Sequence, residues 1–256
     1  MSDILEIEHE LFDAKILLQG AQIVHFQLKD KQKLFWHTDF SFFKEEEPFR
    51  GGIPICWPWF GKKKSPSHGF ARISKWKLIS RIDTPTNVAL EFILNSDMVN
   101  IEYWPYSFEL KLKMNLGKNF SISLEIDSEV ETTAALHTYF YVNNILDVQV
   151  DNLNLNYFDS LENRLVKSDK ENLKIDKQID RIYKMTNYNI INSIHNQIKI
   201  FHKNASDVVV WNPWEDGSSN ISDMKKNDYI NMLCVETARI SKTIKNDYLT
   251  VDIEKR

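Results

Sequence analysis

Alternating apolar and polar positions dominate the chain between residues 108 and 126. From 108 to 114 every second residue is apolar, and the residues between them are Glu or Lys. After a Gly-Lys-Asn turn at 117 to 119, the same alternation returns from 120 to 126. A side-chain period of two is typical of a β-strand with one buried face. The pattern therefore predicts an antiparallel hairpin of two half-buried strands.

Shorter candidate strands follow one another along the rest of the chain. Many strands at close spacing favour an all-β fold, either a sandwich or a barrel. The charged stretch from 160 to 180 mixes apolar positions irregularly, and we interpret it as a surface excursion with short strands. No segment predicts a convincing amphipathic helix. The shorter candidates are 4–8, 14–18, 21–28, 76–82, 87–94, 133–142, 146–150, 197–202, 207–211, 231–237 and 248–253.

Composition adds limits on domain organisation and partners. No linker rich in Gly, Ser or Pro divides the 256 residues and no internal repeat occurs, so we expect one domain covering 1–256. The formal net charge of −4 provides no basic field for nucleic acid, which we do not expect as a partner.

The cysteines and the N-terminal residues bear on the compartment. Cys56 and Cys234 lack the close Cys/His spacing of a zinc site, so we expect reduced thiols and no metal. The chain does not start with a basic segment followed by an apolar one, and no run approaches the roughly 18 apolar residues of a membrane span. These features predict a cytoplasmic protein that does not enter a membrane.

One segment, RGGIPICWPWFG at 50–61, concentrates glycine, proline and tryptophan, and its composition predicts a shaped loop. SHGFAR at 67–72 brings His68 and Arg72 close to Arg50 in sequence. Two guanidinium groups beside glycines suit the binding of a carboxylate or phosphate. Alternatively, the tryptophans belong to the core and the arginines form structural ion pairs. The lysines at 62–64 are interpreted as a solvated turn.

A second candidate cluster is ALHTYFYV at 135–142. Alternation places His137 on the same face as Tyr139 and Tyr141. Aromatic rings with polar tips suit a sugar, because its C–H faces stack on rings while its hydroxyls form hydrogen bonds. The alternative is that His137 is a structural residue with its hydrogen bonds satisfied.

A third candidate is Glu236, at the end of the apolar run MLCVET at 232–237. Poor solvation there would raise the pKa of the carboxyl towards neutrality, as a general base requires. The alternative places Glu236 at the rim of the strand, paired with a cation such as Arg239.

Taken together, these segments resemble the hexose-6-phosphate mutarotases, also called glucose-6-phosphate 1-epimerases, of the aldose 1-epimerase superfamily. The resemblance extends from residue 50 to 237 and implies a galactose mutarotase-like β-sandwich with a concave sugar-binding face. The matching segments, in the order of that family, are RGGIPICWPWFG, SHGFAR, Trp76, LHTYF, DRIY at 180–183, VVWNPW and CVET.

The resemblance also implies roles for individual residues. His137 and Glu236 match the catalytic histidine and glutamate, while Arg50 and Arg72 match the arginines that hold the sugar phosphate. The implied reaction interconverts the α and β anomers of a hexose 6-phosphate and requires no metal, nucleotide or flavin. Further sugar contacts are expected from His68, Asp180 and Trp211.

Two other function classes stay open on the sequence. A non-catalytic carbohydrate-binding protein of the same fold would bind sugar without accelerating anomer exchange. A glycoside hydrolase would use two carboxylates, for which Asp180 and Glu236 are available, but it would leave the histidine segment without a role. We expect a monomer whose partner is a small phosphosugar.

Overall fold

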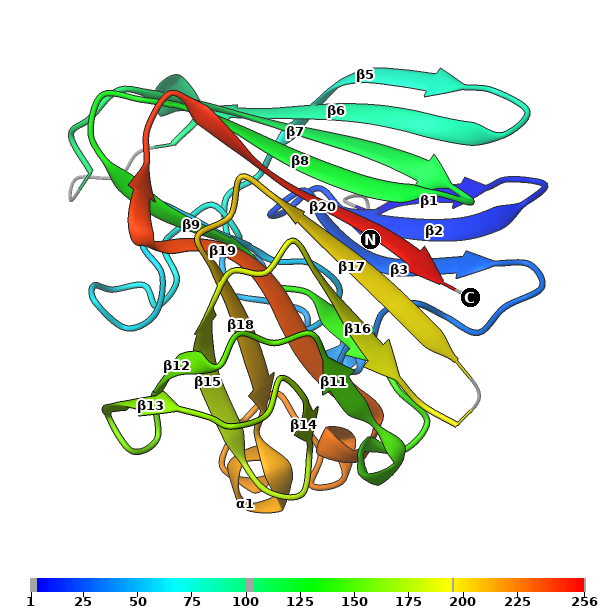
Figure 1. Cartoon of the computed structure of the whole chain (residues 1–256). Helices are drawn as coiled ribbons and strands as arrows, with labels where there is room; N and C mark the ends of the chain where they lie inside the picture. The colour runs from blue at the N-terminus through cyan, green and yellow to red at the C-terminus, as the bar shows by residue number, and fades with distance from the viewer. Residues whose placement is uncertain (1–3, 100–103, 195, 256) are drawn as a thin grey trace.

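The computed structural model describes residues 4–99, 104–194 and 196–255. Two large antiparallel sheets pack against each other across a shared hydrophobic core, and a three-stranded sheet adjoins them (Figure 1). The expected all-β fold is confirmed.

The nine-stranded sheet has the order β14 (Leu173–Lys174), β11 (Gln149–Asp151), β16 (Tyr188–Asn192), β17 (Gln197–Lys203), β20 (Asp247–Lys255), β8 (Phe120–Ser128), β7 (Phe108–Gly117), β6 (Asn87–Asn95) and β5 (Lys77–Asp83). The eight-stranded sheet has the order β13 (Arg164–Lys167), β12 (Asn156–Asp159), β15 (Ile179–Lys184), β18 (Asp207–Asn212), β19 (Met232–Ile244), β9 (Thr132–Leu136) and β4 (Ile55–Cys56), with β10 (Tyr139–Tyr141) also paired to β19. The small sheet has the order β1 (Ile4–Glu8), β2 (Phe12–Leu17) and β3 (Gln22–Leu28). The helical segments are α1 (Trp214–Ser219) and the 3₁₀ turns η1 (Phe40–Phe42), η2 (Ser96–Met98), η3 (Ile145–Asp147) and η4 (Asp228–Asn231).

The predicted hairpin is present as β7 and β8. Leu110 pairs with Ile126 and Leu112 with Leu124, and all four side chains are buried. Burying an aliphatic side chain of this size stabilises a fold by about 1.5–3 kcal/mol. The alternating pattern therefore supplies one wall of the core.

Strand β19 contributes one face to the opposite wall of the core, and its other side chains lie on the outer face of its sheet. Leu233 and Val235 belong to the same buried cluster as the hairpin leucines. Because side chains alternate along a strand, Cys234 and Glu236 lie on the other face of the sheet. Figure 1 shows β19, an interior strand of its sheet, leading through a turn into β20 of the nine-stranded sheet.

Three expectations about secondary structure were wrong in detail. The continuous strand expected over 133–142 is interrupted, because the Thr138 N–H turns back to the Leu136 carbonyl at 2.9 Å. The expected strand at 146–150 begins as η3 and becomes extended only in β11. The short helix α1 was not expected, since its sequence WEDGSS has no apolar stripe.

The segment 50–61 is a shaped loop that contains the two-residue strand β4, paired with β9. Trp57 and Trp59 are 0% and 5% exposed, so the interpretation of the tryptophans as core residues is confirmed. The Trp57 indole N–H donates to the Thr132 hydroxyl at 3.0 Å. These contacts fix the loop against β9.

Gly69→Ala is expected to destabilise the fold by about 3 kcal/mol or more. A Cβ at Gly69 would lie 2.0 Å from the Trp57 carbonyl oxygen, which belongs to a buried backbone. Gly61 has nearly the same φ, 75° against 74°, but no described atom lies within 4 Å of a Cβ built there. Gly61→Ala should therefore cost only the roughly 1–2 kcal/mol of a left-handed backbone. Urea denaturation measures the free energy of unfolding of both variants. Equal losses of stability in Gly69→Ala and Gly61→Ala would contradict the role given to the close contact with the Trp57 carbonyl.

Candidate active site

The register of the eight-stranded sheet brings several predicted residues into one row. Because directly paired residues point to the same face of a sheet, this row defines a common surface, which we call the site face. It lies opposite the main core. In the row, Asp180 of β15 pairs with Trp211 of β18, Trp211 with Cys234 of β19, and Cys234 with Tyr139 of β10.

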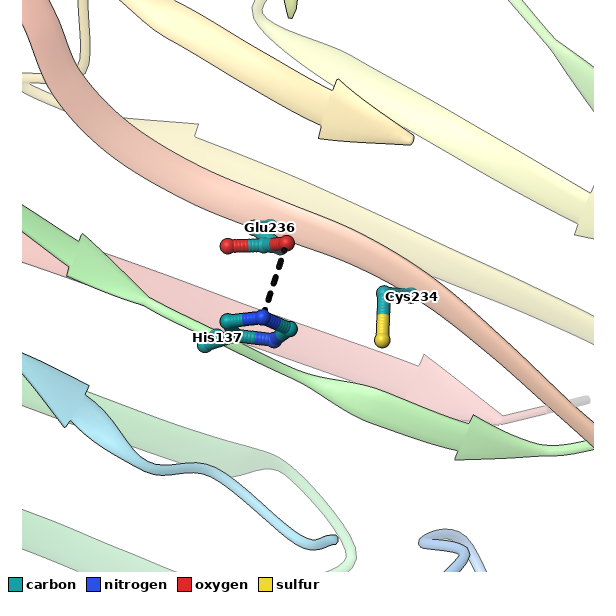
Figure 2. A group of neighbouring side chains, drawn as sticks. All are labelled: His137, Cys234 and Glu236. Atoms are coloured by element: carbon teal, nitrogen blue, oxygen red, sulfur yellow. Dashed lines mark ion pairs between the residues drawn. The ribbon is translucent and has the colours of Figure 1, made fainter. Parts of the chain in front are cut away.

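His137 and Glu236 meet on the site face, two residues along from this row. The pairs on either side, Leu136 with Thr237 and Tyr139 with Cys234, place His137 opposite Glu236. The His137 Nε2 atom lies 3.4 Å from the Glu236 Oε1 atom (Figure 2). His137 is 8% exposed and Glu236 is 1% exposed. Two residues far apart in sequence thus form one buried imidazole–carboxyl pair.

Aromatic side chains enclose the imidazole of His137. It stacks on the ring of Tyr139, with the centroids 4.7 Å apart and the planes 7° apart. The rings of His68 and Trp211 meet it edge-on, at 5.5 Å and 6.3 Å between centroids. The structure therefore brings His68 and Trp211, both predicted as sugar contacts, to the imidazole.

The pocket shifts the two groups of the pair in opposite directions. Burial, and then the charge of Asp180, raises the pKa of Glu236 well above its ordinary value. Burial, and then the neighbouring His68, Arg72 and Arg50, lowers the pKa of His137 well below its ordinary value. The raised pKa of Glu236 agrees with the sequence expectation, while the lowered pKa of His137 works against a protonated imidazole. The pair is therefore suited to share one proton.

The alternatives for these two residues are wrong. Arg239 does not reach Glu236; its Nη1 atom lies 3.6 Å from Asp247 and donates to the Asn204 carbonyl at 3.1 Å. The Nδ1 atom of His137 is buried without a hydrogen-bond partner among the described residues. Glu236 is therefore not a rim residue, and His137 is not a satisfied structural histidine.

The two predicted phosphate-binding arginines differ in their surroundings. The Arg50 Nε atom donates to both carboxylate oxygens of Asp223, at 3.0 and 3.1 Å, and its Nη1 atom donates to the Tyr139 hydroxyl at 3.1 Å. Arg50 therefore forms a structural ion pair, which is the alternative that the sequence analysis left open for the arginines.

Arg72 is the less neutralised of the two cations. Its Nη2 atom donates to the Ser67 carbonyl at 2.5 Å, and its Nε atom is buried with no hydrogen-bond partner among the residues that the structure describes. No ion pair joins Arg72 to a carboxylate in the described part of the chain. A buried donor without a partner and an uncompensated charge make Arg72 a ready receptor for an anion.

His68 and Asp180 lie around the pair, and each has a shifted pKa. Burial, and then the charges of Arg72 and Arg50, lowers the pKa of His68 to about 3, so its ring is neutral. Burial, and then Asp159, raises the pKa of Asp180. The lysines at 62–64 are exposed, as expected of a solvated turn.

Sequence reasoning missed two neighbours of the site. Asp223, the partner of Arg50, lies 173 residues away in a loop without regular alternation, so no sequence signal pointed to it. The sequence predicts Cys234 to be a reduced thiol within an apolar run and does not place it beside the pair. Its Sγ atom and ligand atoms of His137 and Glu236 all lie within 4.8 Å of one another, a spacing that a metal ion could bridge.

The raised pKa of Glu236 predicts a gain in stability on Glu236→Gln. A group whose pKa is raised by folding contributes most below its ordinary value of 4.5, and that contribution is lost as the pH rises through the folded pKa. Glu236→Gln should therefore increase the free energy of unfolding above pH 4.5, by about 0.5–2 kcal/mol, and lose this advantage below it. Denaturant unfolding across pH measures the effect, with Glu125→Gln on β8 as the exposed control. A variant less stable than the native chain at every pH would contradict it.

The antiparallel β-sandwich places the chain in a fold class, the galactose mutarotase-like proteins. The fold is shared with the solved galactose 1-epimerase of Lactobacillus acidophilus NCFM, with a TM-score of 0.75 over 99% of this chain and 94% of that one. The two are only 13% identical, so this likeness concerns the fold alone.

Residues 3–247 match the family model described as aldose 1-epimerase, and the chain belongs to that family. An Escherichia coli K12 protein named "Putative glucose-6-phosphate 1-epimerase" is 34% identical over 95% of this chain and 85% of its own length. A Haemophilus influenzae protein of the same name is 37% identical over 87% and 80%. The crystal structure of "a putative mutarotase (YeaD) from Salmonella typhimurium" is 30% identical, with a TM-score of 0.95 over 100% of this chain and 91% of that one.

Membership of this family makes the chain an isomerase that interconverts sugar anomers. The resemblance seen in the sequence and the mutarotase-like fold it implied are confirmed. The comparisons do not favour the non-catalytic carbohydrate-binding alternative. Among the helices of the described residues, none has the length and apolar character needed to cross a bilayer.

Proposed function

We propose that the chain interconverts the α and β anomers of a hexose 6-phosphate, with glucose 6-phosphate as the substrate to test first. The observation that carries this proposal is the buried His137–Glu236 pair, at 3.4 Å, within the electrostatic reach of Arg72. The pair suits general acid–base chemistry, and the arginine suits a phosphate. The names of the relatives at 34% and 37% identity point to the same substrate.

Anomer exchange requires one base and one acid, and the pair supplies both. Glu236 accepts the proton of the anomeric hydroxyl while His137 donates a proton to the ring oxygen, and the bond between C1 and the ring oxygen breaks. The resulting aldehyde rotates about its C1–C2 bond. The two protons then return in reverse, and the hydroxyl forms on the other face of C1. The pair ends with the proton on His137, as it began.

The sugar phosphate has a second role in this scheme, which concerns the proton on His137. Burial and His68 lower the pKa of His137 most in the free pocket, and the charges of Arg72 and Arg50 lower it further. A phosphate carries about 1.5–2 negative charges near neutral pH and would offset the charge of both arginines. Substrate binding would thus raise the pKa of His137 and favour the protonated imidazole that the ring oxygen needs.

The other predicted residues take supporting roles. Trp211 and Tyr139 offer aromatic faces beside the pair, and Asp180 on the same row offers a carboxyl for sugar hydroxyls. His68, which is neutral, can donate or accept a hydrogen bond next to His137. We further propose that the chain acts as one domain, as a monomer, and in the cytoplasm, where Cys56 and Cys234 would stay reduced as they are here.

Exchange spectroscopy by NMR tests the proposal directly. Cross-peaks between the α and β anomeric protons of glucose 6-phosphate should grow faster with the protein than with buffer or heat-inactivated protein. The same measurement on glucose should show a smaller acceleration, since glucose has no phosphate for Arg72. An unchanged exchange rate for glucose 6-phosphate would refute the proposed substrate.

A further inference from the structure

We propose that His137, Cys234 and Glu236 also form a binding site for a thiol-preferring divalent cation such as Zn²⁺, and that the bound ion inhibits the enzyme. The three side chains come from the site face, where β19 supplies two of them and the turn between β9 and β10 supplies the third (Figure 2). A thiolate, an imidazole and a carboxylate are the ligands that Zn²⁺ uses in proteins.

The spacing of the ligand atoms fits such an ion with little movement. Bonds of about 2.0–2.3 Å in a tetrahedron put ligand atoms about 3.3–3.8 Å apart. The His137 Nε2 and Glu236 Oε1 atoms are already 3.4 Å apart, and no separation within the trio exceeds 4.8 Å. The Cys234 thiol therefore has to approach by about 1 Å, within the reach of a side-chain rotation. Three protein ligands would leave the fourth position to water or a sugar hydroxyl.

A second observation points to a ligand at this place. The Glu236 Oε2 and His137 Nδ1 atoms are both buried and have no hydrogen-bond partner among the described residues. Leaving such a buried group unpaired is destabilising. A cation held by the carboxylate would satisfy Glu236 without a proton. All three residues are more than nine-tenths buried, so water competes poorly for the ion.

The charges that face the trio act in opposite directions on a bound cation. The charge of Asp180 favours a cation, whereas the charges of Arg50 and Arg72 oppose it. The neutral His68 and Tyr139 rings contribute no charge.

Inhibition follows because the ion would occupy both groups of the proton-transfer pair. An imidazole whose Nε2 atom binds a metal cannot donate a proton from that atom, and a carboxylate bound to a metal is a weak base. This consequence rests on the proposed function, whereas the binding of the ion does not. The two parts can therefore fail separately.

Titration with Co²⁺ tests the site independently of activity. Thiolate ligation should produce a near-ultraviolet charge-transfer absorption, which Zn²⁺ should remove by displacement. Cys234→Ala should abolish this absorption and weaken Co²⁺ binding by more than the 10- to 100-fold that loss of a supporting hydrogen bond costs a metal site. Cys56→Ala, which removes the other buried cysteine, should keep both. Absence of the absorption in the native chain, or its persistence in Cys234→Ala, would overturn the proposal.

The inhibition is then measured on anomer exchange of glucose 6-phosphate. Zn²⁺ should slow exchange by the native chain and by Cys56→Ala, and a chelator should restore it. Cys234→Ala should be at least about tenfold less sensitive, judged against its own metal-free rate. Co²⁺ ligation by Cys234 without inhibition would refute the inhibitory role alone. No exchange activity in the metal-free native chain would instead refute the proposed substrate and leave the metal site standing.

Discussion

His137→Asn and Glu236→Gln are each expected to slow protein-catalysed anomer exchange of glucose 6-phosphate by about 10²- to 10⁴-fold. Each substitution removes one of the two proton-transfer groups but keeps a polar side chain of similar size in the pocket. The pair is buried and its atoms are 3.4 Å apart, so water cannot easily replace either group. Exchange spectroscopy at saturating substrate, corrected for spontaneous exchange, measures the rates.

The variant with both substitutions should exchange anomers only slightly more slowly than the slower single variant, because the two groups work as a unit. His9→Asn and Glu125→Gln make the same chemical changes outside the pair and should leave exchange unaffected. Their ring and carboxylate instead contact the Thr84 carbonyl and Lys113. Native exchange rates in both His137→Asn and Glu236→Gln would remove the pair from the mechanism.

Strands whose two faces differ could be predicted from the sequence. β7 and β8 alternate between core and solvent, so the period of two is written into their residues. β19 is buried on both faces from Met232 to Ala238 and therefore reads as a continuous apolar run. Its length and its continuation into the other sheet depend on neighbouring strands, and these are not visible in the run itself.

In the site, too, the sequence predicts what depends on neighbouring residues of one strand, but not what depends on the pairing of distant strands. Alternation placed His137 and Tyr139 on one face, and their rings stack in the structure. The pairing of His137 with Glu236 required knowing that β9 and β10 lie beside β19, which is a matter of sheet order. The ion pair of Arg50 with Asp223 depends on a loop packed against the site face, and packing of that kind leaves no periodic signal.

Arg72→Ala is expected to raise the KM for glucose 6-phosphate by about 10- to 100-fold while changing exchange of glucose much less. A hydrogen bond to a charged group contributes about 1.5–3 kcal/mol, and each 1.4 kcal/mol corresponds to a tenfold change in affinity. Arg72 is the better test than Arg50, because Arg50 also holds Asp223 and Tyr139 and its loss would disturb the wall beside His137. The KM of Arg72→Lys for glucose 6-phosphate should lie between those of the native chain and Arg72→Ala, because lysine keeps the charge but not the planar guanidinium group.

The comparison of the two sugars separates a phosphate receptor from a merely structural arginine. Losing Arg72 weakens the binding of the phosphate, and it also removes one of the charges that, after burial and His68, lower the pKa of His137. Exchange of free glucose, which brings no phosphate, should then be unchanged or slightly faster. Arg81→Ala on β5, which removes an exposed arginine paired with Asp83, is the matched control. Equal losses for both sugars would show that Arg72 supports the fold of the pocket and not the recognition of the phosphate.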